Sequence, residues 1–142
     1  MTLEDDIRSA AQEIVRAFRS NDEETYFAGF ADDCSFAFHT DPAPLIGADA
    51  WREGWRELQA SGWQVKDCRT LWDHVQVIGG GGVYLHELET TAGEPDAIET
   101  YRERESIVFE RRDGRLVAVH EHLSPISAQG DGEAQGDASA GD

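Results

Sequence analysis

The chain has 142 residues, and its 29 acidic against 12 basic side chains give a formal net charge of −17 at pH 7. This acid excess argues against the class of proteins that grip the phosphate backbone of nucleic acids through basic patches. No apolar run reaches the ~20 residues that cross a bilayer, and the length fits one domain with its own core. We therefore expect a protein that partners neither nucleic acid nor membrane.

Two cysteines, Cys34 and Cys68, are too few for a disulfide framework and lack CxxC spacing. The first residues, MTLEDDIRSA, are acidic and contain no apolar stretch of the kind found in secretory signals. We therefore expect reduced thiols and a cytoplasmic location.

The basic side chains are also unusual, because Lys66 is the only lysine. Acid excess with almost no lysine fits a protein from a high-salt cytoplasm, where screening makes like-charge repulsion cheap. The alternative is an ordinary soluble acidic protein. A halophilic origin predicts that the fold loosens at low salt.

The first predicted element is an amphipathic helix from Thr2 to about Ser20, because apolar side chains recur at spacings of three and four. These side chains are Leu3, Ile7, Ala10, Ala11, Ile14 and Phe18. Thr2 followed by Asp5 is similar to a capping box, with aspartate in place of the usual glutamate. The sequence therefore predicts that this helix begins directly after Thr2.

A second helix is predicted from Glu23 to Phe30 and ends at Ala31-Asp32-Asp33. A short strand, Cys34 to His39, and a rigid loop, Asp41 to Pro44, follow, since proline restricts itself and the residue before it. A third helix is predicted from about Asp49 to Ala60, with its tryptophans on one stripe.

The rest of the chain has the pattern of strands. One strand is predicted around Trp63 to Ile78 and a second from Val83 to Thr91, with a turn at Gly79–Gly82 between them. The stretch from Glu99 to Ser124 reads as a hairpin, because Asp113-Gly114 between two β-rich runs is a strong hairpin signal.

In the second strand of this hairpin, alternation places Ala118, His120, His122 and Ser124 on one face and Glu121 on the other. If the histidine face lines a cavity, His120 could serve as an acid or base and His122 as a ligand contact. The alternative is a structural role within the sheet. Two imidazoles on one face could also chelate, but no spacing is diagnostic of a metal site, so we expect none.

The preceding strand divides in the same way. Arg104 shares a face with Arg102 and Ser106, while Tyr101, Glu103 and Glu105 share the opposite face. One face should line a pocket and the other an interface. An inward Arg104 would favour an anionic ligand, and the alternative is a solvated strand rich in charge.

Three helices, with a strand among them, followed by a run of strands predict an α+β domain in which the helices pack on one face of a curved antiparallel sheet. Such a sheet forms a cone with an internal pocket. We expect this domain to span 1–126. The segment 127–142 is a Gly/Ala-rich acidic tail that cannot bury enough surface to order itself.

The C-terminal hairpin resembles that of the association domain of calcium/calmodulin-dependent kinase II and of small SnoaL-like proteins. The matching residues are Ser106, Arg111-Arg112-Asp113-Gly114, His120, His122 and Ser124. The first half is similar to steroid Δ-isomerase, and its matching residues are Asn21-Asp22, Ala31-Asp32-Asp33, Asp41-Pro42 and Gly47. These families share the cone-shaped nuclear-transport-factor-2-like fold, which commonly dimerises through its sheet. The resemblance thus implies this fold and a homodimer.

The isomerase resemblance implies that Asp41, which precedes a proline, is the base that moves a proton beside a carbonyl. The alternative is a turn residue whose carboxylate accepts backbone N–H bonds. The isomerase tyrosine of the first helix corresponds to Ile14, which cannot stabilise an enolate. Tyr26 from the second helix is the substitute that we consider.

Two functions therefore remain open. The first is a cofactor-independent isomerase, cyclase or dehydratase that binds a small molecule, with Asp41 and His120 as catalytic residues. The second is a non-catalytic ligand-binding or oligomerisation module. We expect ligand contacts from Tyr26, Arg104 and His122, and from Trp55 on the third helix, where an aromatic wall would suit an apolar molecule.

Overall fold

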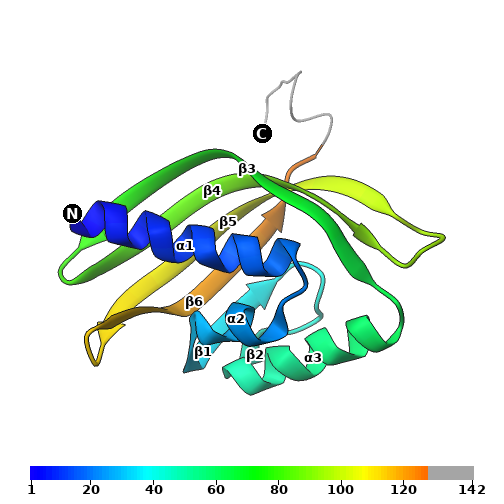
Figure 1. Cartoon of the computed structure of the whole chain (residues 1–142), viewed down its shortest axis with the longest axis horizontal. Helices are drawn as coiled ribbons and strands as arrows, with labels where there is room; N and C mark the ends of the chain where they lie inside the picture. The colour runs from blue at the N-terminus through cyan, green and yellow to red at the C-terminus, as the bar shows by residue number, and fades with distance from the viewer. Residues whose placement is uncertain (128–142) are drawn as a thin grey trace.

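A computed structural model describes residues 1–127, and within them the chain forms three helices and one six-stranded sheet (Figure 1). The elements are α1 (Leu3–Arg19), α2 (Glu23–Ala28), β1 (Phe30–Phe38), β2 (Leu45–Ile46), α3 (Ala48–Ala60), β3 (Gln64–Ile78), β4 (Gly81–Gly93), β5 (Glu99–Arg112) and β6 (Arg115–Pro125). The strand order is β2-β1-β6-β5-β4-β3. Apart from its first residue, the predicted acidic tail lies outside the described residues.

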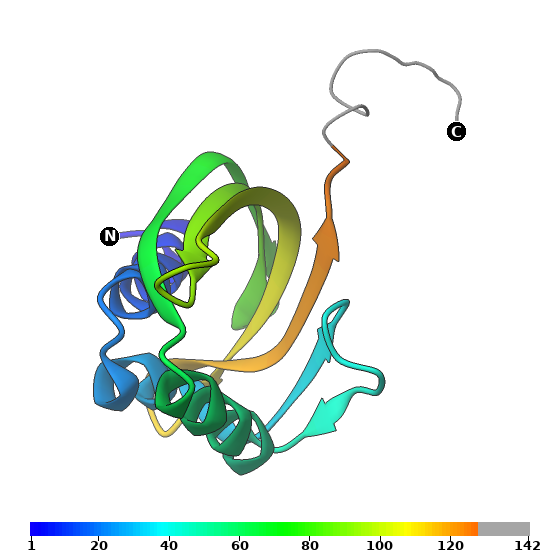
Figure 2. The ribbon, with the colours of Figure 1, turned by 90° about the vertical axis from the view of Figure 1, so that its right-hand side faces the viewer.

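The sheet is strongly curved, and the helices lie on its concave side (Figure 2). The concave face of the sheet and the buried stripe of α1 share one core, in which Ile7, Ala11, Ile107 and Ala118 have no exposed surface. The predicted α+β cone with N-terminal helices is therefore confirmed. Among the helices of residues 1–127, none combines the length and apolarity that a membrane crossing requires.

The N-terminus of α1 forms the predicted capping box. The Thr2 hydroxyl accepts a hydrogen bond from the Asp5 backbone N–H at 3.1 Å, and the Asp5 carboxylate accepts one from the Thr2 N–H at 3.3 Å. Both bonds satisfy N–H groups that have no partner within the helix. Thr2 thus fixes where the helix begins.

The segment around Ala31-Asp32-Asp33 differs from its prediction as a helix end. Helix α2 ends at Ala28, and these residues already belong to strand β1. Strand β1 pairs in parallel with β6, so the sheet is mixed at this position, and it pairs in antiparallel with the short strand β2, which the sequence did not reveal. The tertiary pairing with β6 overrides the weak local preference for helix.

Two glycines assigned to a turn by the sequence lie inside strand β4. A Cβ atom at Gly81 would lie 2.1 Å from the Phe109 carbonyl oxygen, and one at Gly82 would lie 2.4 Å from the Gln76 carbonyl oxygen. No side chain fits so close to a neighbouring backbone. The glycines therefore permit a close approach of strands rather than a loop.

A β-bulge at Val119 interrupts the alternation of strand β6. Ala118 pairs with Phe109, but His120 pairs with Val108, so Val119 has no partner on β5. A bulge moves the residues after it to the opposite parity. As a result, Ala118 and Glu121 both point to the concave face, although alternation alone assigns them to different faces.

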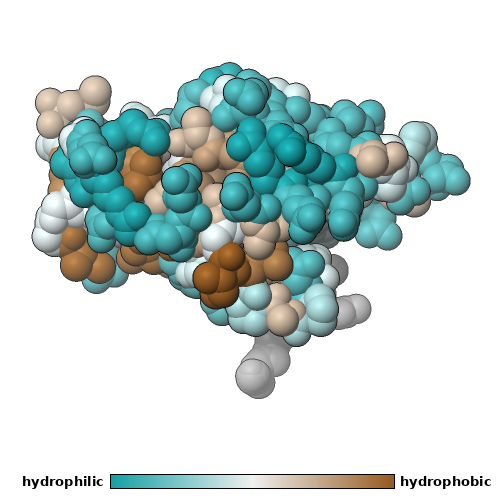
Figure 3. All heavy atoms as spheres, turned by 90° about the horizontal axis from the view of Figure 1, so that it is seen from below, coloured by the Kyte–Doolittle hydropathy of each residue, from teal (hydrophilic) through white to brown (hydrophobic). Residues whose placement is uncertain are grey.

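Most of the visible surface is hydrophilic, with separate hydrophobic patches, when the molecule is seen from below (Figure 3). Among the described residues, four exposed large apolar side chains lie on β3, namely Leu71, Trp72, Val77 and Ile78, and the others are Met1, Ile46 and Ile98. The buried apolar groups gather instead between helices and sheet. That interior also contains the cavity described next.

Candidate functional site

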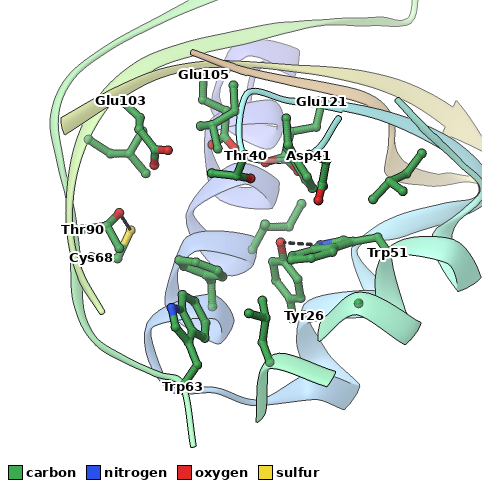
Figure 4. A pocket seen from close by; sticks show the side chains of 18 of the residues that line it. Tyr26, Thr40, Asp41, Trp51, Trp63, Cys68, Thr90, Glu103, Glu105 and Glu121 are labelled. Atoms are coloured by element: carbon green, nitrogen blue, oxygen red, sulfur yellow. Dashed lines mark hydrogen bonds between the residues drawn. The ribbon is translucent and has the colours of Figure 1, made fainter. Parts of the chain in front are cut away.

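A cavity of about 620 Å³ opens between the helices and the concave face of the sheet. Its walls come from α1, α2, α3, the loop before β2 and strands β3 to β6. The volume is within the range that holds a small organic molecule. Aromatic rings lie on the helix side and three buried glutamates on the sheet (Figure 4), while Glu53 and Glu57 add exposed carboxyl groups from α3.

The helix side is built from a continuous aromatic cluster. Trp51 donates a hydrogen bond from its indole N–H to the Tyr26 hydroxyl oxygen at 3.1 Å, and both side chains line the cavity together with Phe18 and Trp63. Burial, followed by the charge of Glu121, raises the pKa of Tyr26 well above its usual value. Tyr26 therefore stays protonated and can donate its own hydrogen to a bound molecule.

The sheet side carries three buried glutamates: Glu103 and Glu105 on β5 and Glu121 on β6. Their exposed fractions are 5%, 7% and 5%. Glu105 lies directly before the fully buried Ile107 in the inward alternation of β5, and Ile107 pairs with Glu121 across the strands. The two carboxyl groups thus reach the same part of the cavity from neighbouring strands.

Two histidines hold the glutamates of β5. The His86 ring lies 2.5 Å from Glu105 through Nε2, and its Nδ1 lies 3.2 Å from the Thr70 hydroxyl. His39 Nε2 lies 2.5 Å from Glu103. His86 is fully buried, whereas the His39 side chain is 29% exposed. Each imidazole N–H donates a hydrogen bond to a buried carboxyl group and offsets part of the cost of its burial.

Glu105 and Glu121 share a hydrogen bond and have opposite pKa shifts. Burial, and then the charge of Glu105, raises the pKa of Glu121 well above its usual value. Burial also acts to raise the pKa of Glu105, but hydrogen bonds from Glu121 and His86 outweigh it and lower this pKa. Of the pair, Glu121 therefore retains its proton to the higher pH, and Glu105 carries the charge.

Glu103 differs from Glu105, because burial raises its pKa more than the His39 hydrogen bond lowers it. One oxygen of Glu121, Oε1, has no hydrogen-bond partner among the described residues. Buried polar atoms are nearly always paired. The cavity therefore presents a protonated carboxyl group with a vacant hydrogen-bonding position.

Of the six residues predicted for the site, only Asp41 and Tyr26 line the cavity. Trp55 is 1% exposed and packs behind Tyr26, with ring centroids 5.3 Å apart. It supports the wall without facing the cavity.

The other three predicted residues lie on the opposite, convex face of the sheet. His120 Nδ1 lies 2.8 Å from the Ser35 hydroxyl, His122 lies beside His120, and Arg104 pairs with Glu87 at 2.7 Å. Asp41 and His120 therefore do not converge. Glu121 points inward, and His120, its neighbour on β6, points to the opposite face.

The alternation of strand β5 already indicated that its glutamates are buried, but the site prediction did not use it. Glu103 and Glu105 continue the alternation of Ile107 and Phe109, which any core would bury. An acid on the apolar face of a strand is rarely accidental, since burial of a charge is costly. No pattern around β6 revealed the bulge at Val119.

The comparisons with known proteins agree with one another on the fold of the chain. Residues 7–128 match the model of a family described as the SnoaL-like domain. A comparison with curated proteins finds no match.

Solved structures resemble the chain at low sequence identity. A nuclear-transport-factor-2-like (NTF2-like) protein from Cytophaga hutchinsonii has a TM-score of 0.77 at 14% identity, covering 89% of this chain and 100% of that one. A ketosteroid isomerase-like protein from Erwinia carotovora has a TM-score of 0.77 at 18% identity, covering 87% and 96%.

A protein from Xanthomonas campestris described as a calcium/calmodulin-dependent protein kinase II association domain has a TM-score of 0.72 at 11% identity, covering 86% of each chain. Likeness at these identities concerns the fold alone. The three resemblances predicted from the sequence are all confirmed at that level.

Proposed function

Since the chain belongs to the SnoaL-like domain family, we propose that it binds a small organic molecule in the cavity and moves a proton on it without a cofactor, as an isomerase or lyase. The observation that carries this proposal is the hydrogen-bonded pair of buried carboxyls, Glu121 and Glu105, which hold opposite protonation states at the cavity wall. Pairs whose pKa values are driven apart are typical of acid–base sites.

The residues divide into donors and a base. Tyr26 presents a phenol that can donate a hydrogen bond to an oxygen that becomes negative when a neighbouring carbon loses its proton. Glu121 donates its proton to Glu105, and its free oxygen Oε1 can accept a hydrogen bond from the bound molecule. Asp41 also lines the cavity and supplies the base. Glu105 and His86 act through Glu121 as positioning residues, because they fix where its proton lies.

This assignment keeps Asp41 and Tyr26 from the sequence hypothesis and replaces His120 by Glu121. Tyr26 supplies a donor that the isomerase resemblance had placed at Ile14, which lines the same cavity without a donor group. Because Asp41 comes from the loop before β2 and Tyr26 from α2, a substrate between them contacts the base and the phenol donor at once.

Exchange of carbon-bound protons tests the proposal. A panel of small ketones and enones is incubated in D₂O with the protein, and exchange at the carbon beside the carbonyl is followed by proton NMR. We expect exchange above the buffer rate that falls on the order of 100-fold in Asp41→Asn and in Glu121→Gln. The control is Glu24→Gln, which makes the same change from carboxyl to amide at a side chain that is 92% exposed.

If a ketone exchanges equally fast in wild type and both cavity variants, the acid–base assignment is wrong. If none of the panel exchanges while cavity ligands still bind, the non-catalytic binding module becomes the function. The two outcomes are distinct, since binding is measured separately by the change in tryptophan fluorescence of Trp51 and Trp63.

We also propose a homodimer that forms through the convex face of the sheet. The supporting observation is a group of partly buried apolar side chains there, Val83, Leu85 and Val108, of which Val83 and Val108 pair across the strands. Sedimentation of the wild type should give a dimer, and Leu85→Lys should give a folded monomer. A wild-type monomer at micromolar concentration would contradict this.

We also propose a cytoplasmic location, which the buried free thiols of Cys34 and Cys68 support.

A further inference from the structure

The cavity is acidic as well as aromatic. Within the described part of the chain, its lining contains no lysine, arginine or histidine. Six carboxyl side chains line it: Asp41, Glu53, Glu57, Glu103, Glu105 and Glu121. His39 and His86 contact Glu103 and Glu105 without lining the cavity themselves. Even with both imidazoles charged, Asp41 and the two exposed glutamates of α3 add negative charge to the cavity lining.

A second observation is independent of this acid cluster. The Glu121 side chain lines the cavity and is nine-tenths or more buried, and its oxygen Oε1 has no hydrogen-bond partner among residues 1–127. An orphan oxygen of this kind costs stability. It indicates a place where a bound molecule supplies the missing positive or hydrogen-bonding partner.

The two walls are opposed in a way that suits one class of ligand. Glu103, Glu105 and Glu121 project from the sheet, and Tyr26, Trp51 and Trp63 face them from the helix side (Figure 4). A cation is attracted to the faces of aromatic rings, with tryptophan the strongest, and to carboxylates. An anion or an acid would meet repulsion from both the carboxylates and the ring faces.

We propose that the cavity recognises an organic cation, an amine or quaternary ammonium, held between the glutamates of β5 and β6 and the aromatic rings of α2 and α3. That this cation is also the substrate rests on the proposed function; that it binds does not. The expected substrate then carries its ammonium group close to the carbon that exchanges its proton. The neutral and anionic analogues bind more weakly.

Binding should be coupled to proton release. Free Glu121 is protonated because it is buried near the charge of Glu105, and Glu103, Tyr26 and Cys68 are its other neighbours that disfavour ionisation. A cation beside Oε1 favours the ionised form and lowers the pKa of Glu121. Affinity for the cation therefore rises with pH until the free carboxyl itself ionises, and binding below that pH releases a proton.

The test uses choline and its neutral isostere 3,3-dimethylbutan-1-ol, which has the same shape with carbon in place of the charged nitrogen. Both are titrated into the full chain at constant ionic strength, with tryptophan fluorescence as the readout. We expect choline to bind on the order of tenfold more tightly than the alcohol. Calorimetry in two buffers of different ionisation heat should show proton release for choline alone.

Glu121→Gln should bring the affinity for choline close to that of the alcohol and abolish proton release. Glu24→Gln is the matched control, because it removes one exposed charge from the surface and should change neither value. Circular dichroism confirms that each variant folds. The wild-type ratio of choline to alcohol is informative even if a variant does not fold.

Equal affinities for choline and the alcohol in the wild type would overturn the inference, because the cavity would then select by shape. Absence of choline binding up to molar concentration would overturn it as well. Neither result bears on ketone exchange, which tests the acid–base function. Conversely, tight choline binding without exchange on any substrate would support the cation site and contradict the enzyme.

Discussion

His86 is the residue whose loss should reveal the energetics of the buried network. It has no exposed surface and bonds Glu105 at 2.5 Å and Thr70 at 3.2 Å. His86→Leu removes both contacts and keeps a side chain of similar volume. Because it leaves the charge of Glu105 buried without this partner, we expect a loss of about 3–5 kcal/mol in the free energy of unfolding at pH 7.

The loss should shrink in acid, and the sign follows from Glu105. Its pKa is lowered in the folded protein, so the stability it contributes is present above the unfolded pKa and disappears as pH falls through the folded pKa. Without His86, burial raises the pKa of Glu105, and its charge disappears at a higher pH. Near pH 4, only the cost of unmade hydrogen bonds, about 1–3 kcal/mol, should remain.

Urea unfolding at pH 7 and pH 4 measures both values. His122→Leu is the matched control, since His122 is exposed on the convex face and its removal should cost under about 0.5 kcal/mol at either pH. The double variant His86→Leu/Glu105→Gln should recover at least half of the loss at pH 7, because it removes the unpaired charge. A loss that is equal at both pH values and is not recovered in the double variant would refute the reasoning.

Three further predictions use other elements. Glu121→Gln should raise the free energy of unfolding, relative to wild type, more at pH 7 than at pH 4. The raised pKa of Glu121 gives the wild type stability below the unfolded pKa that is lost as pH rises, and glutamine has no such loss. An equal effect at both pH values in urea unfolding would contradict this. Thr2→Ala should cost about 1 kcal/mol by removing the α1 cap, while Thr2→Asp should restore most of it. The melting temperature should rise with added KCl if the net charge of −17 reflects a high-salt source, and a salt-independent value would argue for an ordinary acidic protein.

Local patterns predicted the helices and most strands, because their information is contained within a few residues. The capping box at Thr2 and the Asp113-Gly114 turn are complete within four residues each. The parallel pairing of β1 with β6 and the two-residue strand β2 depend on contacts between distant segments. Such contacts leave no periodic trace in either segment.

The site was predicted less well than the fold, for a related reason. Alternation correctly separates Arg104 from Glu105, and His120 from Glu121, but it does not say which face is inward. Histidine and arginine are the more familiar functional residues, and the prediction therefore placed their face of the sheet toward the cavity. The apolar Ile107 and Phe109, which share a face with Glu105, decide the question in favour of the acids.

The buried glutamates indicate that the cavity has a role other than stability. Replacement of a buried ionic network by apolar side chains is often neutral or stabilising, so a stable cone has no need of Glu105, Glu121 and two histidine partners. The network satisfies Glu105 with two hydrogen bonds yet leaves Glu121 Oε1 without one. An arrangement that served stability alone would satisfy both carboxyls or neither. The unsatisfied oxygen belongs to a side chain that lines the cavity, and this is the strongest physical reason to look for function at Glu121.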